Sequence, residues 1–188
     1  MEGKCIILCA PSGAGKTSIT KFLLSQDLHL EFSISVCNRE KRENEVNGVD
    51  YYFISTEGFK NRIENDEFVE WEEVYKDQFY GTLYTEINRI WNKGNNVIFD
   101  VDVEGGLSLS KHFGEKALAI FIKPPSIEEL EKRLRARGSE TEEIIKKRLE
   151  KVEKELEYAK WFDRIVVNDN LERAQQEVLE FVKTFLKK

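Results

Sequence analysis

The chain has 188 residues, the length of one ordinary domain, and its 29 Lys and Arg residues against 35 Asp and Glu residues give a formal net charge of −6. This charge argues against a protein that binds a nucleic-acid backbone. Three cysteines without metal-ligand spacing argue against a disulfide framework, and the first apolar run, 5–10, is too short for a signal peptide or a membrane span, so we expect a cytoplasmic protein that contacts no membrane.

The predicted elements alternate between short apolar strands and amphipathic helices. In chain order they are a strand at 4–9, a helix at 17–26, strands at 32–36 and 51–54, a short helix at 59–65, a strand at 68–74, a helix at 85–91, strands at 96–101 and 117–122, helices at 127–137 and 141–160, a strand at 164–167 and a helix at 171–186. Ser126 is a good N-cap for the helix that follows it, because Glu128 and Glu129 stand in the first turn. The alternation predicts an α/β fold with a parallel sheet flanked by helices and buried on both faces.

The middle of the chain departs from this alternation. Residues 33–92 are richer in strand, aromatic and turn residues, with a turn signal at Asn47-Gly48. We therefore predict a single domain over 1–188, in which a small mixed α+β sub-domain at 33–92 is inserted into the α/β core.

The most specific motif is a phosphate loop between the first strand and the first helix. It fits the pattern G-x-x-x-x-G-K-[ST], with Ala10 where glycine is usual, in the run Ala10-Pro11-Ser12-Gly13-Ala14-Gly15-Lys16-Thr17. The glycines allow successive backbone N–H groups to point inward, and the helix N-terminus adds to this cradle for an anion. Lys16 can reach the β- and γ-phosphates, and the Thr17 hydroxyl can hold Mg²⁺. The alternative is an ordinary glycine turn, which the strand, the Lys-Thr pair and the helix together disfavour.

A second motif is an apolar strand that ends in carboxylates. Asp100 and Asp102 are two residues apart, so they share a face if the strand continues through both. A strand that ends beside a phosphate loop can place a carboxylate where it supports Mg²⁺, and we assign this role to Asp100. The alternative is a polar strand end that caps the next turn, Glu104-Gly105-Gly106.

At this point the sequence resembles the guanylate kinase family, over nearly the whole chain. The motifs that carry the resemblance are the phosphate loop, Phe32-Ser33-Ile34-Ser35, Arg39 with Arg42, the run 45–53, Glu67-Phe68-Val69-Glu70-Trp71, Tyr80-Gly81-Thr82, the run 100–105 and Pro124-Pro125-Ser126. The resemblance implies transfer of a phosphoryl group from ATP to GMP, giving ADP and GDP, with Mg²⁺. It also implies a core at about 1–32, 93–125 and 160–188, a GMP-binding sub-domain at about 33–92 and a helical lid at about 126–159.

By this resemblance, four residues match the positions that read the guanine base: Ser35, Glu70, Thr82 and Asp102. Guanine presents two adjacent donors, N1–H and N2–H₂, beside an O6 acceptor. A carboxylate such as Glu70 can accept both donors, and the hydroxyls can donate to O6. Adenine lacks these donors, so buried carboxylates would be left unpaired against it. Without the resemblance, the favoured interpretation of Glu70 is a solvated edge residue of the acidic stretch 67–73.

The resemblance also assigns phosphate-binding residues on both nucleotides. Those that match the clamp on the GMP phosphate are Arg39, Arg42, Tyr51 and Tyr80, and we add Asp100 to the acceptor site. This loop departs from the family pattern, since Cys37-Asn38 stands where two threonines are common and Lys41 where proline is common. The residues that match the lid arginines and the adenine-side position are Arg133, Arg137, Arg148 and Asn168. Surface salt bridges such as Glu129 with Arg133 are the competing interpretation of the lid arginines.

Two other functions remain open on the residues alone. A different small-molecule kinase could use the same loop with another acceptor, but it would lack Ser35, Glu70 and Asp102 together. A phosphopeptide-binding module related to guanylate kinase typically has a degraded phosphate loop, whereas Lys16 and Thr17 are intact here.

Overall fold

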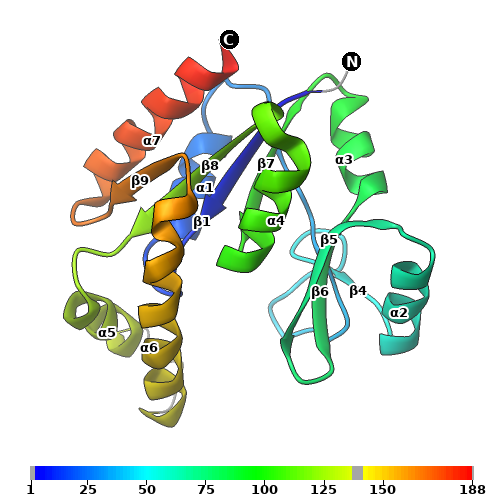
Figure 1. Ribbon diagram of the computed structural model, residues 1–188, viewed down its shortest axis with the longest axis horizontal. Helices are drawn as coiled ribbons and strands as arrows, with labels where there is room; N and C mark the ends of the chain where they lie inside the picture. The colour runs from blue at the N-terminus through cyan, green and yellow to red at the C-terminus, as the bar shows by residue number, and fades with distance from the viewer. Residues whose placement is uncertain (1–2, 137–141, 188) are drawn as a thin grey trace.

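A five-stranded parallel sheet forms the centre of the computed structural model, which describes residues 3–136 and 142–187. Its strands, in spatial order, are β2 (Leu30–Phe32), β7 (Asn96–Val101), β1 (Cys5–Cys9), β8 (Ala117–Lys123) and β9 (Arg164–Val167). Helices α1 (Lys16–Leu24) and α7 (Leu171–Leu186) cover one face, and α3 (Tyr84–Trp91) and α4 (Val103–Phe113) cover the other (Figure 1). The predicted α/β class with a helix-flanked parallel sheet is therefore confirmed.

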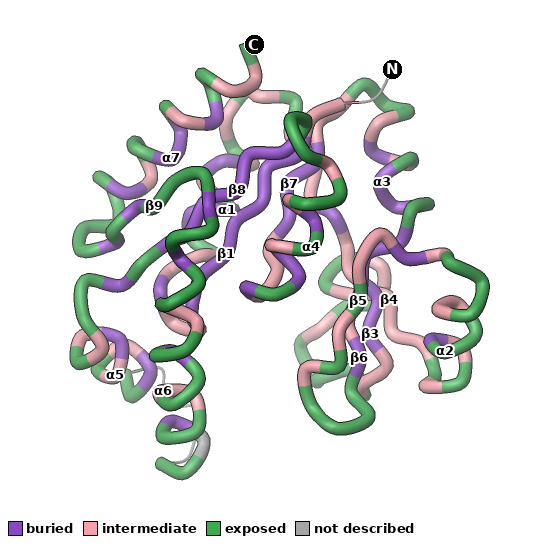
Figure 2. Tube along the Cα trace, viewed as in Figure 1, coloured by how far each residue is buried: buried purple, intermediate pink, exposed green. Residues whose placement is uncertain are grey.

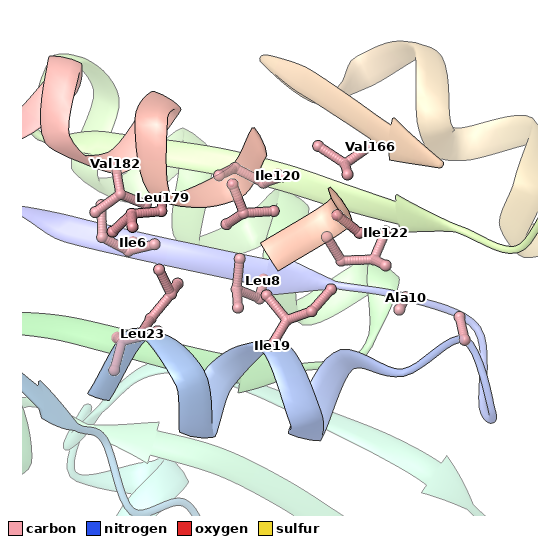
Figure 3. Packing of buried hydrophobic residues seen from close by; sticks show 14 of the residues in the cluster. Ile6, Leu8, Ala10, Ile19, Leu23, Ile120, Ile122, Val166, Leu179 and Val182 are labelled. Atoms are coloured by element: carbon pink, nitrogen blue, oxygen red, sulfur yellow. The ribbon is translucent and has the colours of Figure 1, made fainter. Parts of the chain in front are cut away.

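The central strand β1 contributes to both hydrophobic cores because its side chains alternate between the faces of the sheet. Ile6 and Leu8 pack with Ile19 of α1 and with residues of α7 (Figure 3). Cys5, Ile7 and Cys9 face the opposite core, under α3 and α4. Figure 2 shows the same result, since β1 is buried along its whole length. This continuous burial explains why β1 reads as an apolar run with no polar alternation.

A second, smaller sheet stands beside the first (Figure 1). Its spatial order is β4 (Tyr52–Phe53), β3 (Val36–Cys37), β6 (Gln78–Leu83) and β5 (Phe68–Tyr75), with one parallel and two antiparallel pairings. Helix α2 (Thr56–Glu64) packs on it through Phe59, whose ring stacks on those of Phe68 and Phe79 at centroid distances of 4.5 and 5.5 Å. This sheet and helix form the mixed structure expected within 33–92.

Two further helices lie at the carboxyl end of the main sheet (Figure 1) and pack against the core formed with α1 and α7. These are α5 (Ile127–Ala136) and α6 (Glu142–Glu157), and the single-turn helices η1 (Gly114–Lys116) and η2 (Tyr158–Trp161) complete the described elements. The predicted cap of α5 is confirmed, because Glu129 donates its backbone N–H to Ser126 Oγ at 3.1 Å. Within 3–136 and 142–187, no helix is long and apolar enough to cross a membrane.

The structure corrects the expected strand at 32–36. Residue 32 ends β2 in the main sheet, whereas residue 36 begins β3 in the smaller sheet, so the three residues between them cross from one sheet to the other. Helix α4 and strand β6 were not predicted. The Gly105-Gly106 pair suggested a turn, but Gly106 allows α4 to pack closely, since a Cβ there would lie 2.1 Å from Cys9 Sγ.

Candidate active site

The loop between β1 and α1 forms a backbone cradle. Gly13 and Gly15 have φ angles of 92° and 96°, in the left-handed region that favours glycine. Gly15 is the N-cap of α1, so the N–H groups of the first helical turn point toward the loop. Both glycines are also packed tightly, because a Cβ at Gly13 would lie 3.0 Å from Leu134 and one at Gly15 would lie 2.3 Å from Asn168 Nδ2. The loop is therefore a tightly packed turn whose backbone suits an anion.

Lys16 connects this loop to the acidic end of β7. Its Nζ lies 2.8 Å from Asp100 Oδ1 and also donates to the carbonyl of Val101. Burial alone would lower the pKa of Lys16, but the carboxylate of Asp100 raises it above its ordinary value. The two sequence motifs thus meet at the carboxyl end of the sheet, and Lys16 keeps its positive charge there.

A first cavity of about 300 Å³ lies over the loop. The loop residues that line it are Ala10, Pro11, Ser12, Gly13, Gly15, Lys16 and Thr17, whereas Ala14 is buried beneath them. The opposite wall comes from α6, where Arg148 donates from its guanidinium to Ser12 Oγ. A cavity lined by backbone N–H groups, two lysines and an arginine suits a chain of phosphates.

A second cavity of about 260 Å³ adjoins the first. The expected acceptor-site residues that line it are Ser35, Tyr51, Glu70, Tyr80, Asp100 and Asp102. Thr82 is fully buried behind Glu70 and donates its hydroxyl proton to Glu70 Oε1 at 2.7 Å, so it orients the carboxylate. Asp102 Oδ1 accepts the backbone N–H of Gly105 at 3.0 Å and caps α4. Both carboxylates are therefore held in place before any ligand arrives.

The environment of Glu70 predicts a pH-dependent affinity for the acceptor. Burial, together with the charge of Asp102, raises the pKa of Glu70 from 4.5 to about 7, although the Thr82 hydroxyl lowers it. Only the ionised carboxylate accepts two donors, so we expect the KM for GMP to rise about tenfold for each pH unit below 7. Steady-state kinetics between pH 5 and 8, with Glu70→Gln as the control that lacks this titration, would measure it. A wild-type profile identical to that of Glu70→Gln would contradict the assignment.

The raised pKa of Glu70 makes the stability of the free protein depend on pH in the direction opposite to the affinity for the acceptor. A carboxyl whose pKa is raised on folding contributes stability that is present below 4.5 and is lost as the pH rises through about 7. The pH range in which the Glu70 carboxylate is ionised, and can accept two donors, is thus the range in which its burial costs most.

Arg39 gathers with two of the expected phosphate-clamp tyrosines. Its Nε donates to Tyr80 Oη at 3.0 Å, and its guanidinium lies 5.0 Å from the centroid of the Tyr51 ring. Its Nη1 and Nη2 atoms are bound by the Glu45 carboxylate at 2.7 and 2.6 Å, which lowers the pKa of Glu45 to about 2. Arg42 donates its backbone N–H to the same carboxylate at 2.9 Å, and its side chain is exposed. Three of the four clamp residues are therefore together, with Glu45 aligning the arginine.

The expected donor-side residues outside the loop have distinct positions. Asn168 is buried, and its Nδ2 donates to the carbonyl of Ala14 at 2.7 Å, so its side chain braces the phosphate loop. Arg133 donates to the backbone carbonyl of Asn168 at 3.1 Å and to Glu129 at 3.2 Å, which is the anticipated helical salt bridge. Arg137 lies outside the described residues.

Sequence reasoning missed three residues at or beside the site. Glu72 lines the second cavity, and its carboxyl is hydrogen-bonded to that of Asp102. Lys151 on α6 lines both cavities. Glu72 could have been found because it stands two residues from Glu70 and so shares a strand face with it. Lys151 could have been found because it stands three residues from Arg148 on the same helix face. No local pattern marked the third, Glu86.

Glu86 is a buried carboxylate at the junction of the two sheets. Its Oε1 accepts the backbone N–H of Ile34 at 2.9 Å, next to Ser35. Arg89 donates to both of its oxygens at 2.8 and 2.9 Å, and Tyr52 Oη lies 3.4 Å from Oε2. One side chain therefore ties together the link between the sheets, strand β4 and helix α3.

We expect Glu86→Ala to lower the free energy of unfolding by about 1–3 kcal/mol, because it leaves the Ile34 N–H without its acceptor and leaves Arg89 with Glu31 alone as its carboxylate partner. The KM for GMP should rise because Ser35 loses its support, and the KM for ATP should not change. Denaturant unfolding and steady-state kinetics would measure both effects. Glu86→Gln is the matched control, since its amide oxygen can still accept from Ile34. Equal KM values for GMP in Glu86→Ala and the wild type would contradict this role.

The oxygen atoms near the loop suit Mg²⁺ bound mainly by a ligand. Thr17 presents a hydroxyl to the first cavity, and Asp100 presents a carboxylate where the two motifs meet. In the part of the chain that the structure describes, no three His, Cys, Asp or Glu side chains are grouped to hold a metal. Mg²⁺ commonly takes one or two protein oxygens and completes its octahedron with phosphates and water. These residues therefore fit a magnesium ion that arrives with a nucleotide.

The fold and this site define a phosphate-loop kinase that acts on nucleotides: a parallel sheet, an anion cradle at the start of a helix and an adjoining acidic pocket. A sequence model described as guanylate kinase matches residues 2–185. The chain belongs to the guanylate kinase family and converts ATP and GMP into ADP and GDP.

Individual relatives match over most of their own lengths. The chain is 52% identical to the guanylate kinase of Bacteroides thetaiotaomicron over 100% of this chain and 92% of that protein. It is 50% identical to the guanylate kinase of Porphyromonas gingivalis, covering 98% of this chain and 99% of that one. The crystal structure of guanylate kinase from Anaplasma phagocytophilum superimposes with a TM-score of 0.80 at 27% identity, covering 99% of this chain and 87% of that chain.

Proposed function

We propose that the γ-phosphoryl group moves in line from ATP to a phosphate oxygen of GMP at the point where the two cavities meet. The observation that carries this proposal is Lys16, whose side chain lines both cavities at the carboxyl end of the sheet. The acceptor oxygen is already an anion, so the reaction requires no strong general base. Catalysis then depends on bringing two polyanions together and neutralising their charge.

The first cavity is the proposed ATP site. Backbone N–H groups of the phosphate loop would bind the phosphates, and Arg148 and Arg133 would add positive charge from the α5–α6 pair. Asn168 would act on the loop rather than on the base, because its amide is bound to Ala14. Thr17 and Asp100 would hold Mg²⁺, which neutralises phosphate charge when it is bound.

The second cavity is the proposed GMP site. Glu70 and Asp102 would accept the N1–H and N2–H₂ donors of guanine, and Ser35 would donate to O6. Arg39, Tyr51 and Tyr80 would bind the phosphate of GMP, with Arg42 approaching from its exposed loop. Thr82 would keep Glu70 oriented. Adenine would leave both carboxylates unpaired, which supports selectivity of roughly 10⁴-fold.

Three parts of the chain would then have separate functions. Residues 33–92 would bind GMP, residues 126–159 would close over ATP, and the remainder would form the core. The segments 33–92 and 126–159 must together exclude water from the site, because ATP would otherwise be hydrolysed. We expect ATP and GMP analogues together to reduce the radius of gyration measured by small-angle X-ray scattering. Scattering profiles that are identical with and without the nucleotides would contradict closure.

The three cysteines are unpaired and buried, in keeping with a reducing, cytoplasmic compartment.

A coupled assay of ADP release tests the proposed substrate assignment. The purified chain would be assayed with ATP and Mg²⁺ against GMP, dGMP, AMP, CMP and UMP. We expect turnover with GMP to exceed that with AMP by about 10⁴-fold in kcat/KM. Equal rates with GMP and AMP would contradict the assigned roles of Glu70 and Asp102.

A further inference from the structure

Lys151 occupies the boundary between the two cavities. Among the described residues, Lys16, Asp102 and Lys151 line both cavities, and only the two lysines are cations. Lys16 reaches this boundary from the phosphate loop, whereas Lys151 reaches it from α6, on the opposite wall. A phosphoryl group that passes from one cavity to the other must cross this boundary, so it would pass between the two ammonium groups.

Two carboxylates hold the Lys151 side chain at this place. Its Nζ lies 3.8 Å from Asp102 Oδ2 and 3.5 Å from Glu155 Oε1. Burial alone would lower the pKa of Lys151, but Glu155 and Asp102 raise it above its ordinary value, so the ammonium remains charged. The side chain is 50% exposed, which leaves its four-carbon stem free to move toward a phosphate.

The neighbours of Lys151 on α6 support this placement. Arg148 stands three residues earlier, about one helical turn, and donates to Ser12 Oγ in the phosphate loop. One face of α6 therefore presents Arg148 to the phosphate loop and Lys151 to the boundary between the two cavities. Lys154 stands three residues later and lines neither of the two cavities.

We propose that Lys151 is a second catalytic lysine, which contacts the transferring phosphoryl group from the lid side while Lys16 contacts it from the loop side. This inference rests on the proposed assignment of the two cavities to ATP and GMP. In the step itself, the bond between the γ-phosphorus and the β–γ bridging oxygen breaks and its electron pair stays on ADP. A bond forms from a GMP phosphate oxygen to the same phosphorus, and Lys151 neither gains nor loses a proton.

The test compares Lys151→Met with Lys154→Met, a lysine of the same helix that lies one turn away. At saturating ATP and GMP, kcat of Lys151→Met should fall by about 10²-fold, as for loss of one charged donor to a transition state. Lys154→Met should remain within about twofold of the wild type, because its exposed side chain lines neither of the two cavities. Lys151→Arg should recover at least about a tenth of the wild-type kcat, because it keeps the charge.

Two results would overturn the proposal. An unchanged kcat in Lys151→Met would remove any role in the chemical step. A raised KM for GMP with an unchanged kcat would show that Lys151 only aligns Asp102. Thermal unfolding of each variant separates a loss of folding from a loss of catalysis, and Lys151→Arg is the second variant if Lys151→Met is unstable. Turnover of GMP by the wild type tests the proposed function itself, so the two failures are distinguishable.

Discussion

Lys16→Met is expected to reduce kcat by about 10²–10³-fold, the cost of removing one preorganised charged donor from a transition state. The ammonium lies between the phosphate loop and the end of β7, 2.8 Å from Asp100, and the raised pKa of Lys16 keeps it charged throughout the neutral range. It is therefore positioned before substrate binds, and the enzyme needs no reorganisation to use it. Steady-state kinetics with both nucleotides at saturation would measure the loss.

The matched control for this change is Lys21→Met, since Lys21 lies on the same helix α1 and is exposed. Its kcat should equal that of the wild type. Removal of Lys16 leaves Asp100 without its ammonium partner, so thermal unfolding of the variant must be measured beside the kinetics. A folded Lys16→Met enzyme with wild-type kcat would contradict the assignment of the loop to ATP.

Glu70→Gln is expected to reduce the preference for GMP over AMP by about 10–100-fold, because a hydrogen bond to a charged group contributes about 1.5–3 kcal/mol. A glutamine keeps one acceptor oxygen but presents an NH₂ group where the second guanine donor would bind. The loss should appear mainly in the KM for GMP, and the pH dependence below 7 should disappear with the carboxyl. The ratio of kcat/KM for GMP to that for AMP is the quantity to compare.

Glu73→Gln is the matched control for Glu70→Gln, because Glu73 is an exposed residue of the same strand β5. Its selectivity should equal that of the wild type. Thr82→Val offers a second check, since it removes the hydroxyl that lowers the pKa of Glu70. Its pH profile should shift to a higher pH. Unchanged selectivity in Glu70→Gln would exclude Glu70 as a reader of the base.

The phosphate loop was predictable from sequence because its function depends on neighbours along the chain. Strand, glycines, lysine and helix follow one another within a few residues, and each has a local conformational reason to be there. The Lys16 to Asp100 contact was also foreseeable, because parallel strands end at one edge of the sheet. These are consequences of short-range geometry and of the α/β pattern.

The missed features depend on tertiary contacts instead. The 32–36 segment has strand-forming residues throughout, but its two ends pair with different sheets, and the Glu86 carboxylate accepts the Ile34 N–H between them. Helix α4 was not predicted because its close approach to β1 requires Gly106, which belongs to the glycine pair that suggested a turn. Lys151 contacts Asp102 across 49 residues of chain, so its position could not be read from either neighbourhood.

The wall that the two cavities share imposes a thermodynamic reciprocity. Lys16, Asp102 and Lys151 line both cavities, so a nucleotide bound in one would change the electric field in the other. The coupling free energy is the same for both ligands. If ATP changes the dissociation constant of GMP by some factor, GMP changes the dissociation constant of ATP by the same factor. The cell's ratio of adenine to guanine nucleotides would thereby regulate how strongly this enzyme retains each of them.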